Sequence, residues 1–224
     1  MTAPSTDDCP DWSSDGPETR EGGFQQSFGR AYRAAGKKAL ENTLHPDDCR
    51  EWHYLMFSSH VPIGYYAGNF RQVNPSFPCL NCDVGVDGIP GSSPDCVGRD
   101  IALLFQELQR VTAGFQTAWP ELAPEKRALH LAIILGYMVG RFIQIHPFLN
   151  GNGRISRLLW AWGLWRFGVP AQVRVRRHPE NPTYNSIMAK AMRGDFNPLA
   201  LFILSHLSQF PPKTGARDAP PAAE

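Results

Sequence analysis

The stretch HPFLNGNGRISR, residues 146–157, lies between two segments whose apolar side chains recur at helical spacing, 128–145 and 154–167. Gly151 and Gly153 indicate a tight connection between the two expected helices, because glycine tolerates positive φ angles. The same twelve residues hold one imidazole, two side-chain amides and two guanidinium groups. Each of these parts is common in ordinary turns and solvated helix faces, but their joint occurrence favours a site that handles phosphate.

The residue types in this stretch suit one kind of chemistry. Successive backbone N–H groups at Gly151 and Gly153 can converge on an anion, and the helix that begins near Arg154 adds the positive end of its dipole. Arg154 and Arg157 are three residues apart, so they share a helix face and can both reach phosphate oxygens. His146 ends the preceding helix and can accept a proton from a hydroxyl. The stretch therefore predicts transfer of a phosphoryl or nucleotidyl group onto a hydroxyl.

At eleven of its twelve positions, the stretch resembles the signature of the Fic domain family, HPFx(D/E)GN(G/K)RxxR. YAGNFR, residues 66–71, is similar to the family segment that enters a flap hairpin, and residues from about 47 to 209 resemble the family's all-α core. The resemblance implies a protein nucleotidyltransferase, most often one that moves AMP from ATP onto a Ser, Thr or Tyr hydroxyl of a target protein.

The resemblance also implies a role for each matching residue. His146 would be the base that deprotonates the target hydroxyl, and Phe148 would anchor the loop in the core. The anion hole would be formed by Gly151, Asn152 and Gly153. The β- and γ-phosphates would be bound by Arg154 and Arg157.

The implied co-substrate is ATP with Mg²⁺ or Mn²⁺. The implied partner is a target protein that pairs with the flap by strand addition, and Phe70–Pro78 is the expected edge.

Asn150 departs from the signature, which usually has Asp or Glu there to hold Mg²⁺. An amide oxygen can ligate Mg²⁺, but it carries no negative charge, and hard cations prefer carboxylates. We therefore expect Asn150 to be a weak metal ligand, with altered nucleotide choice, reduced transfer or loss of activity as alternatives. On the metal argument, Asn150→Asp should raise Mg²⁺-dependent transfer. The second functional hypothesis is a nucleotide-binding or interaction module that does not catalyse transfer.

A segment before the core partly matches an inhibitory pattern found in many family members, (S/T)xxxE(G/N). In KKALEN, residues 37–42, Glu41 and Asn42 match, whereas Lys37 stands where Ser or Thr belongs. In the family, this Glu pairs with the last Arg of the signature. Glu41 is therefore either an inhibitory residue or an ordinary surface glutamate near a helix end.

The 224-residue length suits one well-buried domain, and 42% hydrophobic and 19% charged residues are typical of a soluble globular protein. The formal net charge of +1 predicts neither a nucleic-acid partner nor strong attraction to a membrane. Residues 128–145 are nearly long enough to span a bilayer, but they carry His130, Arg141 and Gln144, which favours a buried core helix. With a polar N-terminus as well, a cytoplasmic location is expected.

Five cysteines, an odd number without an export signal, argue against a disulfide framework. Cys79 and Cys82 have the spacing of a metal-binding knuckle, with Cys96 as a third ligand and Cys49 or His45 as a fourth. Structural zinc is thus the alternative to free thiols in a loop.

The fold class expected is all-α with a small β-hairpin flap, in one domain over residues 24–210. Residues 1–23 are rich in Ser, Asp, Gly and Pro, and residues 211–224 have a similar character, so both ends are expected to be disordered tails. Residues 64–98 carry six glycines and four prolines and are expected to hold the flap. Helical spacing is found over 24–44, 47–57, 100–119, 124–145, 154–167, 182–193 and 198–209. The tryptophans at 160, 162 and 165 fit core packing, with an oligomer contact as the alternative.

Overall fold

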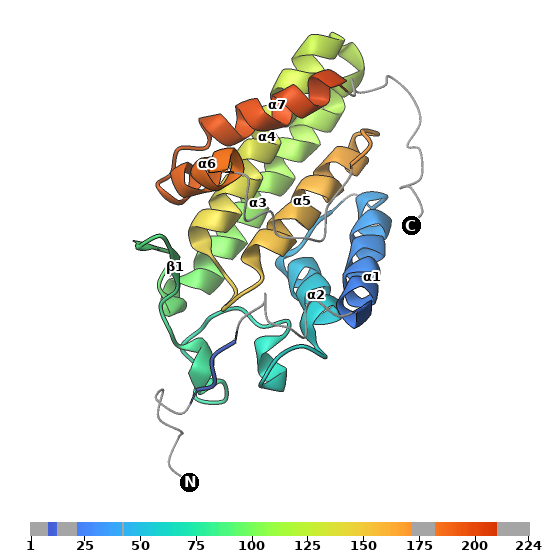
Figure 1. Ribbon diagram of the computed structural model, residues 1–224. Helices are drawn as coiled ribbons and strands as arrows, with labels where there is room; N and C mark the ends of the chain where they lie inside the picture. Colours follow the sequence, from blue (N-terminus) through green and yellow to red (C-terminus); the bar gives the residue numbers. More distant parts are fainter. Residues whose placement is uncertain (1–8, 13–21, 42, 172–181, 210–224) are drawn as a thin grey trace.

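The computed structural model describes residues 9–12, 22–41, 43–171 and 182–209, and this part of the chain is mainly helical (Figure 1). Its α-helices are α1 (Gly22–Ala39), α2 (Pro46–Phe57), α3 (Pro94–Ala118), α4 (Pro124–Ile145), α5 (Asn152–Arg166), α6 (Pro182–Met192) and α7 (Asn197–Gln209). Short 3₁₀ turns η3 (Gly64–Tyr66), η4 (Pro78–Leu80) and η5 (Trp119–Glu121) and the strands β1 (Gly85–Val86) and β2 (Ile89–Pro90) complete it. The all-α class with a small hairpin is confirmed.

The central helix is α4, which contacts α3, α5, α6 and α7. Its length and composition would allow it to cross a membrane. In the structure, however, it lies inside the helical bundle (Figure 1), and its apolar side chains Leu131, Leu135, Met138 and Phe142 are buried. The expected buried core helix is therefore what the structure contains.

The helix α5 lies between α4 and α1 and is buried along most of its length. Trp162 and Trp165 are buried, and Trp165 meets the Tyr32 ring of α1 edge to face at 4.7 Å. Gly163 lets α4 approach closely, since a Cβ there would lie 2.2 Å from Leu135. These contacts explain Trp162 and Trp165 by core packing, and the half-buried Trp160 packs at the edge of the same core.

The helices follow the expected ranges with two larger differences: α1 ends at Ala39, five residues before the expected Leu44, and α3 begins six residues ahead of the expected Asp100. Its start signals are present in the sequence. Ser93 has the extended backbone of an N-cap residue, Pro94 occupies the first turn and Asp95 follows it. Residues 94–99 therefore belong to α3, and the flap region is shorter than expected.

The flap is a short antiparallel hairpin in which Gly85 faces Pro90 and Val86 faces Ile89. Asp87 and Gly88 form its turn, and both have positive φ angles, 51° and 73°, as a tight two-residue hairpin turn requires. The expected pairing edge at Phe70–Pro78 is wrong, because that segment forms no strand in the structure. It is held instead by individual bonds such as Gln72 N–H to the Leu80 carbonyl, 3.1 Å.

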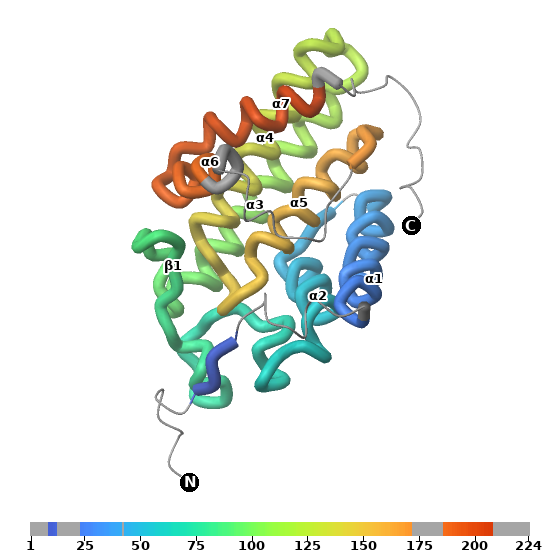
Figure 2. The backbone as a smooth tube through the Cα atoms, viewed as in Figure 1, coloured from blue at the N-terminus to red at the C-terminus, as the bar shows by residue number. Residues whose placement is uncertain are grey.

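The N-terminal strap, which we define as residues 9–12, corrects two expectations. Cys9 forms a disulfide with Cys79, and Trp12 packs into an aromatic cluster, so this part of the expected disordered tail is ordered (Figure 2, short blue tube). The expectation of no disulfide is wrong as well. Residues 1–8, 13–21, 42, 172–181 and 210–224 lie outside the described part of the chain.

The cysteines expected as zinc ligands do not form a zinc site in this fold. The Cys79 sulfur is bonded to Cys9 and cannot act as a thiolate ligand, while Cys49 is enclosed in the hydrophobic core. Among the described residues, no three His, Cys, Asp or Glu side chains gather as a metal site would need. Cys82 and Cys96 are free thiols, and His45 instead precedes α2 as its N-cap residue.

Candidate functional site

His146 occupies the C-terminal end of α4 in the left-handed conformation, with φ 53° and ψ 58°. Its N–H donates to the Phe142 carbonyl at 3.1 Å, and its ring Nδ1 lies 3.2 Å from the Ile143 carbonyl. A proton on Nδ1 therefore leaves Nε2 with a free lone pair. Burial, with a smaller contribution from the charge of Arg71, lowers the pKa of His146 to about 4. The imidazole is thus neutral at pH 7, as a base must be.

Arg71 fixes the backbone around His146 although it is fully buried. Its guanidinium donates to four carbonyls, those of Cys82 (3.0 Å), Ser92 (2.7 Å), Ile145 (3.2 Å) and His146 (2.9 Å). Its backbone N–H donates to Pro147 at 2.8 Å. A cation at the last carbonyls of α4 also complements the helix dipole. Arg71 therefore joins the end of α4 to both sides of the flap.

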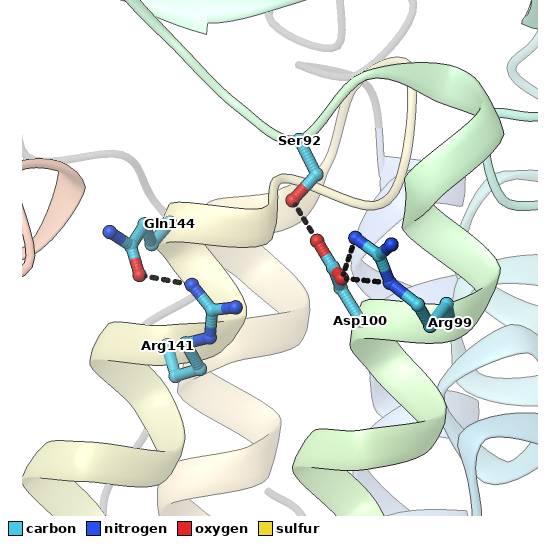
Figure 3. Close-up of polar contacts among 5 residues, drawn as sticks. All are labelled: Ser92, Arg99, Asp100, Arg141 and Gln144. Carbon is cyan, nitrogen blue, oxygen red and sulfur yellow. Dashed lines mark hydrogen bonds and ion pairs between the residues drawn. The ribbon is translucent and has the colours of Figure 1, made fainter.

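The base of the flap lies directly against His146. A Cβ on Gly91 would come within 2.7 Å of the His146 Cβ. Ser92 N–H donates to the Ile145 carbonyl at 3.1 Å, and its hydroxyl donates to Asp100 on α3 at 2.7 Å. Figure 3 shows Ser92 reaching across to Asp100, which Arg99 also contacts at 3.0 Å. On the α4 side of the same view, Arg141 pairs with Gln144.

The loop between α4 and α5 is held by its own side chains. Asn152 clamps Phe148 through both amide atoms, accepting from its N–H at 2.9 Å and donating to its carbonyl at 2.8 Å. Gly151 has φ 80°, and a Cβ there would lie 2.5 Å from Phe57. Its carbonyl accepts from the N–H of Arg154 at 3.0 Å. The Asn152 and Gly153 N–H groups, first in α5, have no acceptor within the helix and can face an anion.

His53 of α2 supports this loop from beneath. Its ring stacks on Phe148 with centroids 3.9 Å apart. Its Nδ1 accepts from Gly68 N–H at 2.9 Å, so the proton resides on Nε2, which donates to the Asn150 carbonyl at 3.0 Å. Complete burial lowers the pKa of His53 to about 3. The ring is therefore neutral and fixed in one tautomer.

Arg154 and Arg157 lie on the first two turns of α5, as their spacing predicts. The Arg154 guanidinium is buried over the rings of Phe24, at 5.0 Å, and Phe57, at 5.8 Å. Arg157 is half-buried. Arg154 thus packs between α5, α1 and α2. Phosphate binding by the two arginines stays a prediction.

The inhibitory role considered for Glu41 is wrong in this fold. Glu41 follows α1, where it is 52% exposed and pairs with Lys38 at 2.7 Å. Phe24, at the opposite end of α1, is the residue that lies over Arg154. Along a helix that rises 1.5 Å per residue, Glu41 is roughly 20 Å from the arginines of α5. It is the ordinary surface glutamate of the alternative interpretation.

Asn150 uses both ends of its amide inside the protein. Its Oδ1 accepts from Gly151 N–H at 2.7 Å, and its Nδ2 donates to the Trp12 carbonyl at 2.9 Å. No cluster of three His, Cys, Asp or Glu side chains exists in the described part of the chain. The residues present therefore do not fit a divalent metal held by carboxylates.

The structure brings His146, Phe148, Asn152 and the glycines together in one loop, as the sequence predicts. The contacts of Arg71, His53 and Trp12 with this loop are not predicted by the sequence. Arg71 lies within YAGNFR, residues 66–71, so its place in this segment could have indicated a role at the site. His53, inside a helix, and Trp12, in a polar segment, have no sequence feature that indicates such a role.

Comparisons with known proteins agree with this geometry. The family model described as Fic/DOC family matches residues 43–164. Protein adenylyltransferase Fic of Drosophila persimilis is 32% identical over 104 residues, which cover 46% of this chain and 18% of that protein. The counterpart in Drosophila ananassae is 31% identical over 106 residues, which cover 46% of this chain and 19% of that protein. The chain therefore matches less than a fifth of the length of these curated relatives.

Two solved structures share the fold. A Fic domain containing signaling protein from Bacteroides thetaiotaomicron superposes with a TM-score of 0.58 at 19% identity, covering 83% of this chain and 66% of that one. The N-terminal Fic domain of a Bep effector protein from Bartonella quintana, with bound ADP, gives a TM-score of 0.50 at 16% identity. The match covers 81% of this chain and 83% of that chain. At these identities the likeness concerns the fold alone.

Proposed function

This chain belongs to the Fic/DOC family, and from that membership we propose that it transfers AMP from ATP to a Ser, Thr or Tyr hydroxyl of a target protein. The observation that carries the proposal is the neutral His146, held beside the flap and next to the N–H groups that open α5. The curated relatives are named protein adenylyltransferases, and one structural neighbour holds ADP.

In the proposed reaction, His146 acts as the general base. Its Nε2 takes the proton of the target hydroxyl while the hydroxyl oxygen attacks the α-phosphorus of ATP. The bond from that phosphorus to the bridging oxygen breaks, and pyrophosphate leaves. The N–H groups of Asn152 and Gly153 stabilise charge on the phosphate oxygens, and Arg157 binds the outer phosphates. No step is assigned to a metal, because Asn150 and the described residues around it do not form a site for a divalent metal held by carboxylates.

The flap would position the target. Its two short strands leave unpaired backbone groups at their outer edges, and an extended segment can add there as a further strand. Gly91 and Ser92 connect this hairpin directly to the end of α4. A hydroxyl on the added segment would thereby be carried towards Nε2 of His146.

Incubation with ATP labelled at the α-phosphate tests the proposal. The acceptors are the protein itself and the proteins of a lysate, and intact-mass measurement shows whether AMP has been added. Incorporation of AMP should fall at least 100-fold in His146→Ala. His130→Ala is the matched control, since His130 lies on the same helix but is exposed. It should transfer normally. Undiminished labelling of His146→Ala would refute the assignment of the base.

A second function is supported by Asn150, whose amide is engaged by Gly151 and Trp12. A nucleotide-binding module without transfer would bind ADP and ATP with similar affinity and would label no protein. Calorimetric binding of both nucleotides, beside the labelling assay, separates the two functions.

A further inference from the structure

The N-terminal strap is attached to the body of the protein at three points. The disulfide joins Cys9 to Cys79, the Tyr66 hydroxyl donates to the Pro10 carbonyl at 3.2 Å, and Asn150 Nδ2 donates to the Trp12 carbonyl at 2.9 Å. Figure 2 shows the strap beside the segment that precedes the flap. The chain thus places a segment distant in sequence against the loop after α4.

The Trp12 ring rests on the residues that support this loop. It meets Phe57 edge to face at 5.2 Å and His53 at 5.9 Å, and stacks against Tyr66 at 6.0 Å. His53 holds the Asn150 carbonyl, and Phe57 lies directly below Gly151. Displacement of the strap would therefore remove packing from beneath the phosphate-binding loop.

An amide at position 150 matches this arrangement and a carboxylate does not. The amide donates to Trp12 through Nδ2 and accepts from Gly151 N–H through Oδ1. An ionised carboxylate could accept from the Gly151 N–H. It could not donate to the Trp12 carbonyl, and one of its oxygens would face that carbonyl oxygen. The departure from the family signature at Asn150 therefore has a structural cause within this chain.

We propose that Asn150 is a positioning residue that fastens the N-terminal strap to the phosphate-binding loop, and that the Cys9–Cys79 disulfide maintains this attachment. Nucleotide affinity would then depend on the redox state of the disulfide. This inference rests on the proposed function, because it assumes that the loop binds nucleotide phosphates.

The redox step needs a dithiol reductant. Two electrons and two protons pass to the disulfide, the Cys9–Cys79 sulfur–sulfur bond breaks, two thiols form, and the reductant is oxidised to its own disulfide. The strap would then be held by two hydrogen bonds and the contacts of Trp12. Local opening of such a segment is favoured once the covalent link is lost.

The test measures ADP binding by calorimetry without magnesium, so that neither transfer nor a metal is required. Reduction with a dithiol should weaken ADP binding about five- to tenfold, the equivalent of one ordinary hydrogen bond. Cys9→Ser should be equally weak and should not respond to reductant. Cys96→Ser, a free thiol on α3, is the matched control and should behave like the unaltered protein.

Asn150→Ala and Asn150→Asp test the fastening itself. Both should weaken ADP binding to the level of Cys9→Ser, and hydrogen exchange in residues 146–157 should become faster in all three variants. Tighter ADP binding in Asn150→Asp when magnesium is added, with unchanged exchange, would instead identify a metal position. ADP binding insensitive to reduction and to Cys9→Ser would overturn the strap proposal. Complete absence of ADP binding in the oxidised protein would refute the proposed function itself.

Discussion

At the scale of single residues, the properties of His146 follow from where α4 ends. The left-handed backbone turns its ring back so that Nδ1 faces the Ile143 carbonyl, and Arg71 places a positive charge nearby. Burial and this charge both disfavour the imidazolium form. The ring is therefore a weaker base than a free histidine, but it is fully in the basic form at neutral pH.

This lowered pKa predicts the acid side of the pH profile. Transfer needs neutral His146, so kcat/KM should hold as pH falls below 6.5 and should decline only as pH falls through about 4. The ring can be followed directly by NMR titration, and the unaltered protein should show no protonation of His146 near pH 6.5. An acid limb or a ring titration centred at 6.5 would contradict the structure.

The two loop glycines offer a matched pair of substitutions. Gly151→Ala puts a Cβ 2.5 Å from Phe57 at a residue with positive φ. It should lower the free energy of unfolding by about 2–4 kcal/mol. Gly153→Ala meets no heavy atom within 4 Å and lies in the first turn of α5, so it should change stability by less than about 1 kcal/mol. Urea denaturation measures both, and equal effects would argue against this loop geometry.

Local sequence predicted the loop residues better than their supports. His146, Asn152 and the glycines interact within a few positions of one another, and such local geometry is visible in the order of residues. Arg71 donates to the Ile145 carbonyl and His53 to the Asn150 carbonyl, which are 74 and 97 positions away. Nothing in local periodicity specifies such partners, because they depend on how the helices pack.

At the scale of elements, the helices followed their periodicity, whereas the flap did not. Two strands of two residues each are too short for an alternating pattern, and the hairpin is specified by the Asp87–Gly88 turn. The segment before it is held by Arg71 rather than by strand pairing. The flap hairpin is therefore attached to the helices by Arg71 and Ser92 rather than by pairing with further strands.

Removal of that side chain should loosen the flap. Arg71→Met leaves the Cys82, Ser92 and His146 carbonyls without their donor, so the free energy of unfolding should fall by about 3 kcal/mol or more. The Ile145 carbonyl loses one donor but keeps the N–H of Ser92. The Michaelis constant for the target should rise because the pairing edge is no longer fixed. Arg99→Met is the control, since the Arg99 side chain is exposed and pairs with Asp100 at the surface. Its effect should stay below about 0.5 kcal/mol. Equal stability of the two variants would refute the anchoring role.

At the scale of the whole molecule, one core extends from α1 through α5 to α7, and the site lies where its helices converge on the loop after α4. The strap adds a covalent link between segments 70 positions apart. Disulfides are typical of oxidising compartments, and the cytoplasmic location expected from the sequence stays a prediction. Composition could not reveal this link, because an odd cysteine count is compatible with one bond and free thiols.

Two neutral histidines, the buried His53 and the half-buried His146, should make the whole fold sensitive to acid. The pKa of His53 is lowered from 6.5 to about 3 and that of His146 to about 4. Below pH 6.5 the unfolded chain binds protons that the folded chain does not, so stability is full above pH 6.5 and declines as pH falls towards these values. At pH 5, each histidine should lower the free energy of unfolding by about 2 kcal/mol relative to neutral pH.

Urea denaturation between pH 7.5 and 5 measures this dependence, and His53→Gln isolates one contribution. Glutamine can still donate to the Asn150 carbonyl and accept from Gly68, but it does not titrate. The variant should therefore lose about half of the decline, even if its stability at pH 7.5 is lower. His130→Gln, an exposed change on α4, should leave the slope unaltered. An unchanged slope in His53→Gln would mean that His53 is not held neutral by burial, and would place the acid sensitivity elsewhere in the fold.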